Sequence, residues 1–370
     1  MSEVTVYHHD PIEVNPRTSW TGLCPPLREA AYSDIQTARD PRVTRLFDYA
    51  RPDAVVSVDG EPIVSIEQTQ MNPSGHNIPQ RFSALVRAAE LGVPGILYYP
   101  KYSRRTFSDP NVRYLQVRVP LANLRLTEIY EVPSLSMFWP TDPVTLLPKT
   151  DASCHQPIAN VVAELIEHAA DHRSALVSLP SVRAAVEEMS GAVEEYGSRY
   201  GKNPSVRALR PTGFAGALLR DGASIDPPQV VQLHETASYL AQLEAIRTAG
   251  PDWDNVRAAL ASRSHTLVLT GTANHSRTDS EHPWPGYLTL IDILYARSDN
   301  GRSPADRQTN LCYVLPVQLE TFLSRAARAE PPTAVNIVDT FADLTVLTGG
   351  VVAGKPVRGE RGPAAVLHGG

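Results

Sequence analysis

Two acidic residues lie in neighbouring predicted strands within the first hundred residues. Asp53 precedes the β-branched run AVVSV, and Glu67 lies within the run PIVSIEQTQ. Asp59-Gly60 between the runs is typical of a tight turn, so the sequence predicts an antiparallel β-hairpin. Its geometry can bring both carboxylates to the same end of a sheet. Magnesium prefers oxygen ligands and keeps waters for phosphate chemistry, so the pair is a candidate magnesium site.

Side chains alternate between the two faces of a strand, so Glu67 shares its face with Ser65 and Thr69. Gln68 and Gln70 point the other way. Glu67 is therefore the acidic member of its face.

The segments around the hairpin predict helices and one more strand. Asn77 can cap a helix with Gln80 three residues on, apolar residues recur at helical spacing to residue 89, and Gly92 ends the helix. The run VPGILYYP then predicts a buried strand. Further helices are predicted over 27–38 and 43–49. The order helix, hairpin, helix, strand indicates a mixed sheet flanked by helices.

The rest of the chain predicts a helical connection and a second, C-terminal α/β unit. We expect a domain boundary near residue 150, giving domains 1–150 and 151–370, and a mobile Gly-rich tail from residue 349. A strand is expected in VRYLQVRVP and a looped connection over 132–157. Helices are expected over 158–170, 182–196, 230–249, 253–262 and 318–327, with strands in HTLVLTG, YLTLIDILYA, TNLCYVLP and TAVNIVDTFADLTVLT.

Composition limits the classes of function. The formal net charge of -6 gives no global attraction to nucleic acid, so any surface that binds phosphate must be local. The three separated cysteines lack a zinc or thiol-exchange spacing, which indicates free thiols. No apolar run is long enough to span a membrane and the start lacks a secretory pattern, so we expect a cytoplasmic protein.

Pro52-Asp53, the hairpin and Glu67-Gln68-Thr69 together resemble the PD-(D/E)XK nuclease superfamily, over roughly residues 27 to 100. The resemblance implies a restriction-endonuclease-like fold whose core has the helix, hairpin, helix, strand order. It implies that Asp53 and Glu67 bind Mg²⁺ and that the protein hydrolyses DNA phosphodiester bonds.

Thr69 occupies the position of the family's lysine, which orients or activates the attacking water. Threonine cannot stabilise developing negative charge as an ammonium can. Family members sometimes supply the missing polar group from the following helix, and His76, Gln80 and Arg81 lie at that helix's start. Arg81 can replace the charge and Gln80 can orient a water, while Lys101 is a weaker candidate.

Other family features map onto single residues. Glu29, in the helix predicted over 27–38, resembles an extra acidic metal ligand of some members. Candidate DNA contacts follow the core strand or lie on the helix before it, and a solvated basic patch is equally compatible with them. They are Lys101, Arg104, Arg105, Arg81 and Arg87, with Tyr98, Tyr99 and Tyr102 among them for stacking.

The sequence therefore predicts a magnesium-dependent endonuclease of the restriction or phage-defence kind. Two-strand cutting favours a homodimer, with the C-terminal unit recognising the target or making dimer contacts. The alternative is a nuclease-like subunit that has lost catalysis and binds DNA or assembles with partners. A third interpretation is a different α/β enzyme with a pocket near Asp292 and Trp284. In the simplest interpretation, the first unit is an ordinary α/β domain in which Asp53 merely starts a strand, Glu67 is solvated and Asn77 only caps a helix.

Overall fold

The chain forms two compact units, Met1–Gly201 and Lys202–Gly370, in the computed structural model. The structure describes residues 3–70, 77–104, 106, 108, 110–115, 117–169, 173–199, 230–245, 247–249, 253–270, 309–326, 342–353 and 365–369. The contacts between residues thus place the division after Gly201, well beyond the domain boundary expected near residue 150. The helices expected over 158–170 and 182–196 belong to the first unit.

The first unit is built on a mixed sheet of order β2-β1-β3-β4-β5-β8. β1 is parallel to β2 and antiparallel to β3, β3 is antiparallel to β4, and β4, β5 and β8 are parallel. The strands are β1 (Val4–His8), β2 (Ala31–Asp34), β3 (Ala54–Val58), β4 (Glu61–Gln68), β5 (Gly95–Pro100) and β8 (Ser134–Trp139).

The predicted hairpin is confirmed as β3 and β4. Asp59 and Gly60 both have positive φ, 50° and 81°, which suits a two-residue turn whose twist matches the strands. The register shifts once, since Val56 pairs with Val64 but Ser57 pairs with Pro62. Ile63 is therefore the extra residue of a β-bulge in β4.

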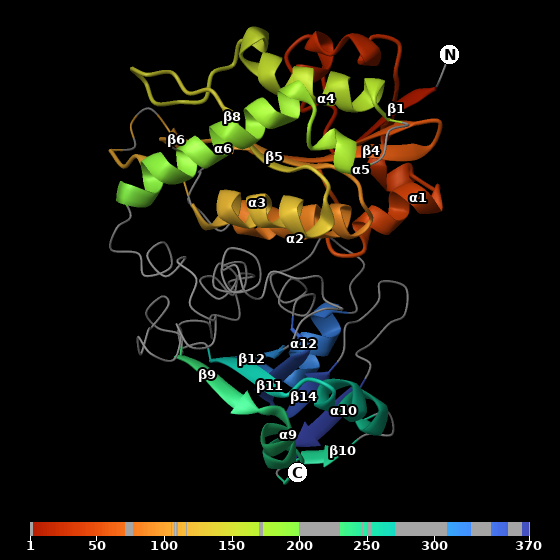
Figure 1. The fold of residues 1–370 in the computed structure, drawn as a ribbon, viewed down its shortest axis with the longest axis vertical. Coiled ribbons are helices and arrows are strands. Elements are labelled where there is room, and N and C mark those ends of the chain that lie inside the picture. Colours follow the sequence, from red (N-terminus) through yellow and green to blue (C-terminus); the bar gives the residue numbers. More distant parts are fainter. Residues whose placement is uncertain are drawn as a thin grey trace. The chain divides into compact units, whose positions relative to one another are not determined.

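Helices cover both faces of this sheet (Figure 1). α2 (Asn77–Glu90) and α3 (Arg118–Tyr130) lie on one face, and α4 (Gln156–Glu167) and α6 (Pro180–Arg199) on the other. Val55 of β3 packs towards α2 with Ala88, whereas Ile66 of β4 packs with Val162 of α4. The smaller elements are 3-10 helices Trp20–Leu23, Pro25–Leu27, Ile35–Thr37, Arg45–Phe47 and Ala152–His155, helices α1 (Pro41–Thr44) and α5 (Arg173–Leu176), and the β6–β7 pair (Tyr102–Ser103, Arg113–Tyr114).

Outside the hairpin, α2 and β5, several sequence predictions for this unit are wrong. The helix expected over 27–38 is absent, because Ala31–Asp34 pairs with β1 instead. The strand expected in VRYLQVRVP is a two-residue strand followed by α3, whose Val119, Ala122 and Leu126 are buried at helical spacing. The expected connection over 132–157 contains β8, which is buried along its whole length.

The second unit holds another mixed sheet, of order β10-β15-β14-β13-β12-β11-β9. Its strands β11, β12 and β13 are parallel, which fits the α/β unit expected there. The elements are β9 (Val230–Glu235), α9 (Thr236–Ala245), β10 (Arg247–Ala249), α10 (Trp253–Ala261), β11 (His265–Thr270), β12 (Thr309–Gln318), α12 (Leu319–Ala326), β13 (Leu344–Thr348), β14 (Gly350–Ala353) and β15 (Ala365–Gly369).

Two predictions for this unit are corrected. The helix expected over 230–249 is only α9, because β9 pairs with β11 and β10 pairs with β15. The tail expected to be mobile from residue 349 contributes β14 and β15 to the sheet. Asp292 and Trp284 lie outside the described residues. Among the helices that the structure describes, none combines the length and apolarity needed to cross a bilayer.

Asn310 joins three elements of the second unit through its buried side chain. Its Nδ2 donates to the Leu260 carbonyl at 2.9 Å and lies 3.3 Å from Thr236 Oγ1, and its Oδ1 accepts from Arg263 at 3.2 Å. A buried amide with satisfied donors and acceptor ties α10, β12 and the start of α9 together.

Replacing Asn310 by alanine should destabilise the second unit, because it leaves buried donors and acceptors without partners. The expected loss of unfolding free energy is about 2–3 kcal/mol, measured by chemical denaturation followed by circular dichroism. Ser262→Ala, which removes an exposed hydroxyl in the same unit, should leave the transition in place. Equal midpoints for both variants would show that the network does not contribute to stability.

Candidate functional site

Asp53 and Glu67 meet at one end of the first sheet. Ala54 pairs with Ile66, so continuing this antiparallel register sets Asp53 opposite Glu67, on the same face. The backbone N–H of Gln68 donates to Asp53 Oδ2 at 2.8 Å, and the N–H of His9 donates to the Asp53 carbonyl at 2.8 Å. The carboxylate of Asp53 is thus oriented by the strand that carries Glu67.

Arg81 lies against both carboxylates from the first half of α2. Its Nε is 3.2 Å from Glu67 Oε2 and 3.4 Å from Asp53 Oδ2. The side chain of Glu67 is only 4% exposed, that of Asp53 15% and that of Arg81 27%. One guanidinium therefore bridges two acids that come from neighbouring strands, and the arginine is the most exposed of the three.

Glu13 is a third acidic residue of the site, and the sequence analysis did not single it out. Its carbonyl accepts from Gln68 Nε2 at 3.2 Å, and its carboxyl group interacts with Gln68, Asp53 and Arg81. The turn that carries it follows β1, whose His8 pairs with Ala54 beside Asp53. The alternating run VTVYH could have predicted this strand and thereby the place of Glu13.

The carboxyl groups repel one another in a poorly solvated place. Burial, with the nearby charge of Asp53, raises the pKa of Glu13 to about 7. Burial and then Asp53 also raise the pKa of Glu67 well above its usual range, although Arg81 opposes this. Burial lowers the pKa of Arg81, but Glu67 and Asp53 outweigh it and the net shift is upward. One guanidinium does not compensate three ionised carboxyl groups, so the site takes up additional positive charge, either as protons, which the raised pKa values of Glu13 and Glu67 reflect, or as a cation.

Magnesium fits the donor chemistry and the charge of this site. Asp53 and Glu67 supply the oxygen ligands that the ion prefers, and a guanidinium already acts there as their counter-ion. Within the described part of the chain, however, no group of three or more histidine, cysteine or acidic side chains is arranged to hold a metal ion. A bound ion would have to displace Arg81, whose Nε lies within 3.4 Å of one oxygen of each carboxylate.

Other residues predicted for the site lie elsewhere or outside the described part. Glu29 is exposed in the turn before β2, because the helix expected to carry it is absent. The side chains of His76 and Gln80 lie outside the described residues, although Gln80 belongs to the first turn of α2. The backbone N–H of Thr69 donates to the Tyr98 carbonyl, so Thr69 extends the pairing of β4 with β5.

Three of the candidate DNA contacts on and just after β5, Lys101, Tyr98 and Tyr99, are engaged within the protein. Lys101 Nζ lies 2.9 Å from Glu188 Oε1 and 4.7 Å from the centre of the Phe138 ring. Tyr98 and Tyr99 are buried, and Tyr98 stacks on Trp139 at 4.9 Å. The two tyrosines therefore belong to the core rather than to a stacking surface.

The remaining basic candidates differ in their partners. Arg87 forms ion pairs with Asp48 and Glu90 and lies over the Tyr49 ring. Arg104 donates its backbone N–H to the Leu146 carbonyl, and its Nε is buried without a hydrogen-bond partner. Arg105 lies outside the described residues.

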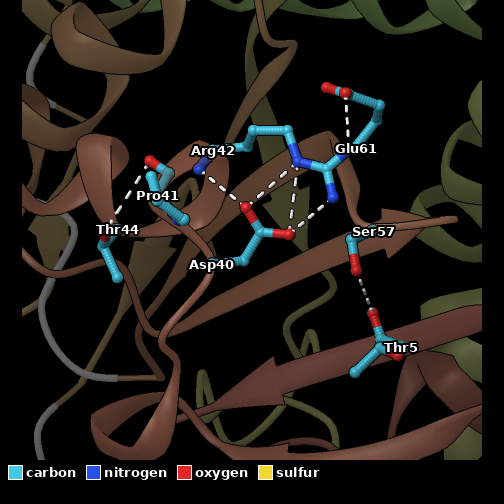
Figure 2. Close-up of polar contacts among 7 residues, drawn as sticks. All are labelled: Thr5, Asp40, Pro41, Arg42, Thr44, Ser57 and Glu61. Carbon is cyan, nitrogen blue, oxygen red and sulfur yellow. Dashed lines mark hydrogen bonds and ion pairs between the residues drawn. The ribbon is translucent and has the colours of Figure 1, made fainter.

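A second arginine bridges two carboxylates at the opposite end of the hairpin, in an exposed setting (Figure 2). Arg42 lies 2.6 Å from Asp40 and 2.7 Å from Glu61, with its own side chain 46% exposed and that of Glu61 63% exposed. Hydrogen bonds from Arg42 lower the pKa of Asp40. Exposed pairs of this kind contribute little to stability, so Arg42 and Glu61 offer matched controls for Arg81 and Glu67.

The raised pKa of Glu13 predicts that stability falls as the pH rises from about 4.5 to about 7. In this window the folded protein binds a proton at Glu13 that the unfolded chain has lost, so a higher pH favours unfolding. Glu13→Gln should flatten the dependence of the thermal midpoint on pH, measured by scanning calorimetry.

Glu29→Gln supplies the control, since it makes the same chemical change at an exposed acid. Its pH profile should follow that of the wild-type protein. Parallel profiles for Glu13→Gln and the wild type would contradict the assignment of this titration to Glu13.

Comparisons with known proteins gave no significant match. No family model matches the chain, and neither a curated protein nor a solved structure matches it significantly.

Proposed function

We propose that the first unit is a magnesium-dependent endonuclease that hydrolyses DNA phosphodiester bonds. The observation that carries this proposal is the convergence of Asp53 and Glu67, from adjoining strands, on the guanidinium of Arg81. Paired carboxylates at a sheet end provide oxygen ligands for a divalent ion, and a nearby arginine suits an anionic phosphate.

The order of elements around the site supports the resemblance to the PD-(D/E)XK superfamily. Asp53 precedes β3 and Glu67 lies in β4, the two strands of the hairpin, and α2 then leads to β5 beside β4. Of the two helices expected before the hairpin, the one over 27–38 is absent, and the one over 43–49 is found as α1 (Pro41–Thr44) continued by the 3-10 helix Arg45–Phe47. The hairpin, helix and strand are the part of the family's order that this unit shares.

The chain's own residues define what each would do in the reaction. Magnesium, when bound, supplies Lewis-acid chemistry that makes a coordinated water a better nucleophile. Asp53, oriented by the Gln68 N–H, and Glu67, which is shielded from solvent, would hold the ion. Arg81 would hold a phosphate oxygen and stabilise the charge that develops there, in place of the lysine that Thr69 replaces.

A nuclease-like subunit without catalysis is the second candidate. Two observations favour it: Thr69 stands where the family has lysine, and Arg81 already pairs with both carboxylates. In this function the first unit binds DNA or a partner protein without cutting. The C-terminal unit is proposed, in either case, to recognise the target or to form a homodimer.

DNA cleavage should depend on both carboxylates. We expect purified protein with magnesium or manganese to cut plasmid or genomic DNA, modified DNA included, with Asp53→Asn and Glu67→Gln each slowing cleavage on the order of 100-fold. Gel electrophoresis of time courses measures the rates.

Glu61→Gln is the matched control, because it removes a carboxylate from the exposed end of the same strand. It should cut like the wild type. Wild-type protein that retards DNA in a gel but never cuts it would favour the inactive subunit, and protein that neither cuts nor binds DNA would contradict both functions.

A further inference from the structure

We infer that Arg81 exchanges partners during ligand binding: a divalent cation takes its place on Asp53 and Glu67, and Arg81 turns to a phosphodiester. Cation and phosphodiester then bind cooperatively. This inference rests on the proposed function, since it assigns the order in which the same site takes its two ligands.

The geometry makes Arg81 and a cation compete for the same atoms. The Nε of Arg81 lies within 3.4 Å of one oxygen of each carboxylate. Among the described residues, these two carboxylates, with Glu13 beside them, offer oxygen donors to a divalent ion at this sheet end. An ion bound to both of them cannot share its position with the guanidinium, because like charges repel at such distances.

Burial decides which partner moves. Glu67 projects from a central strand and is almost inaccessible, and Asp53 is tied to the Gln68 N–H. Arg81 is the most exposed member and has a long side chain with several rotatable bonds. The guanidinium can therefore turn towards solvent while the carboxylates stay where the strands hold them.

Leaving either partner without an opposite charge is unfavourable. Carboxylates that lose Arg81 need another cation, and a partly buried guanidinium that loses its carboxylates needs another anion. A divalent cation supplies the first and a phosphodiester supplies the second. Each ligand thus relieves the charge that the other leaves uncompensated, and by linkage each must strengthen the binding of the other equally.

Arg42 shows why this coupling belongs to Arg81. It also bridges two acids (Figure 2), but Arg42 and Glu61 are exposed and only Asp40 is partly covered, so water compensates a broken pair. Removing Arg42 should therefore not change cation binding at the other end of the hairpin. Arg42→Gln removes the same charge as Arg81→Gln and so controls for the change in net charge.

The experiment is calorimetric titration of the full chain with Mg²⁺, with and without dimethyl phosphate, the smallest phosphodiester. In the wild-type protein, dimethyl phosphate should strengthen Mg²⁺ binding about tenfold. Arg81→Gln should bind Mg²⁺ about tenfold more tightly than the wild type without phosphate, and dimethyl phosphate should no longer have an effect. Arg42→Gln should behave as the wild type, and circular dichroism checks that each variant is folded.

Arg81→Lys provides a second variant, because its point charge is easier to release while it can still bind phosphate. It should bind Mg²⁺ more tightly than the wild type and keep some dependence on dimethyl phosphate. The exchange is overturned if dimethyl phosphate does not change the Mg²⁺ affinity of the wild-type protein and if Arg81→Gln binds Mg²⁺ as tightly as the wild type does. That result would still support the metal site. If neither wild type nor folded Arg81→Gln binds Mg²⁺, the proposed metal site fails and the exchange with it.

Discussion

Carboxylates brought together at a sheet end need positive charge, and the organisation of the first unit follows from that need. The register of β3 against β4 forces Asp53 and Glu67 into proximity, and the β1 turn adds Glu13. Arg81 supplies the one compensating charge described among them. Because Glu67 has almost no access to water, the helix that carries Arg81 must lie close to the strand.

Close packing between α2 and the sheet meets that requirement. A side chain at Gly95 in β5 would begin 3.1 Å from Leu85 of α2, so glycine allows the helix to approach the strand beside β4. Phe82, Leu85 and Val86 are fully buried on the sheet-facing side of the helix. The same apolar face that stabilises the fold thereby sets the position of the guanidinium, and packing and electrostatics depend on one helix.

The central part of the fold was predictable because its determinants are local. Alternation, the Asp59-Gly60 turn and the helical spacing after residue 77 indicated β3, β4, α2 and β5 without knowledge of distant partners. The neighbours of these elements were not predictable in this way. Ala31–Asp34 becomes a strand only because β1 offers it an edge, and Glu13 reaches the site only through that same β1. As the additional acidic residue of the site, the sequence indicated Glu29 in a helix. The segment after Glu29 pairs with β1 as a strand instead, and Glu29 is exposed in the turn before it.

The bulge at Ile63 determines which residue of β4 lies opposite Asp53, because it shifts the register of β4 by one residue. From the Val58–Glu61 pair at the turn, an unbroken ladder would set Asp53 opposite Ile66, an apolar residue. The extra residue advances β4 by one position and sets Glu67 there instead. Deleting the bulged residue while the turn stays fixed would leave Asp53 opposite Glu67. If the bulge closed instead by a one-residue shift in register, with no deletion, Ile66 would lie opposite Asp53. An irregularity in the backbone of β4 thus decides whether a carboxylate or an apolar side chain lies opposite Asp53.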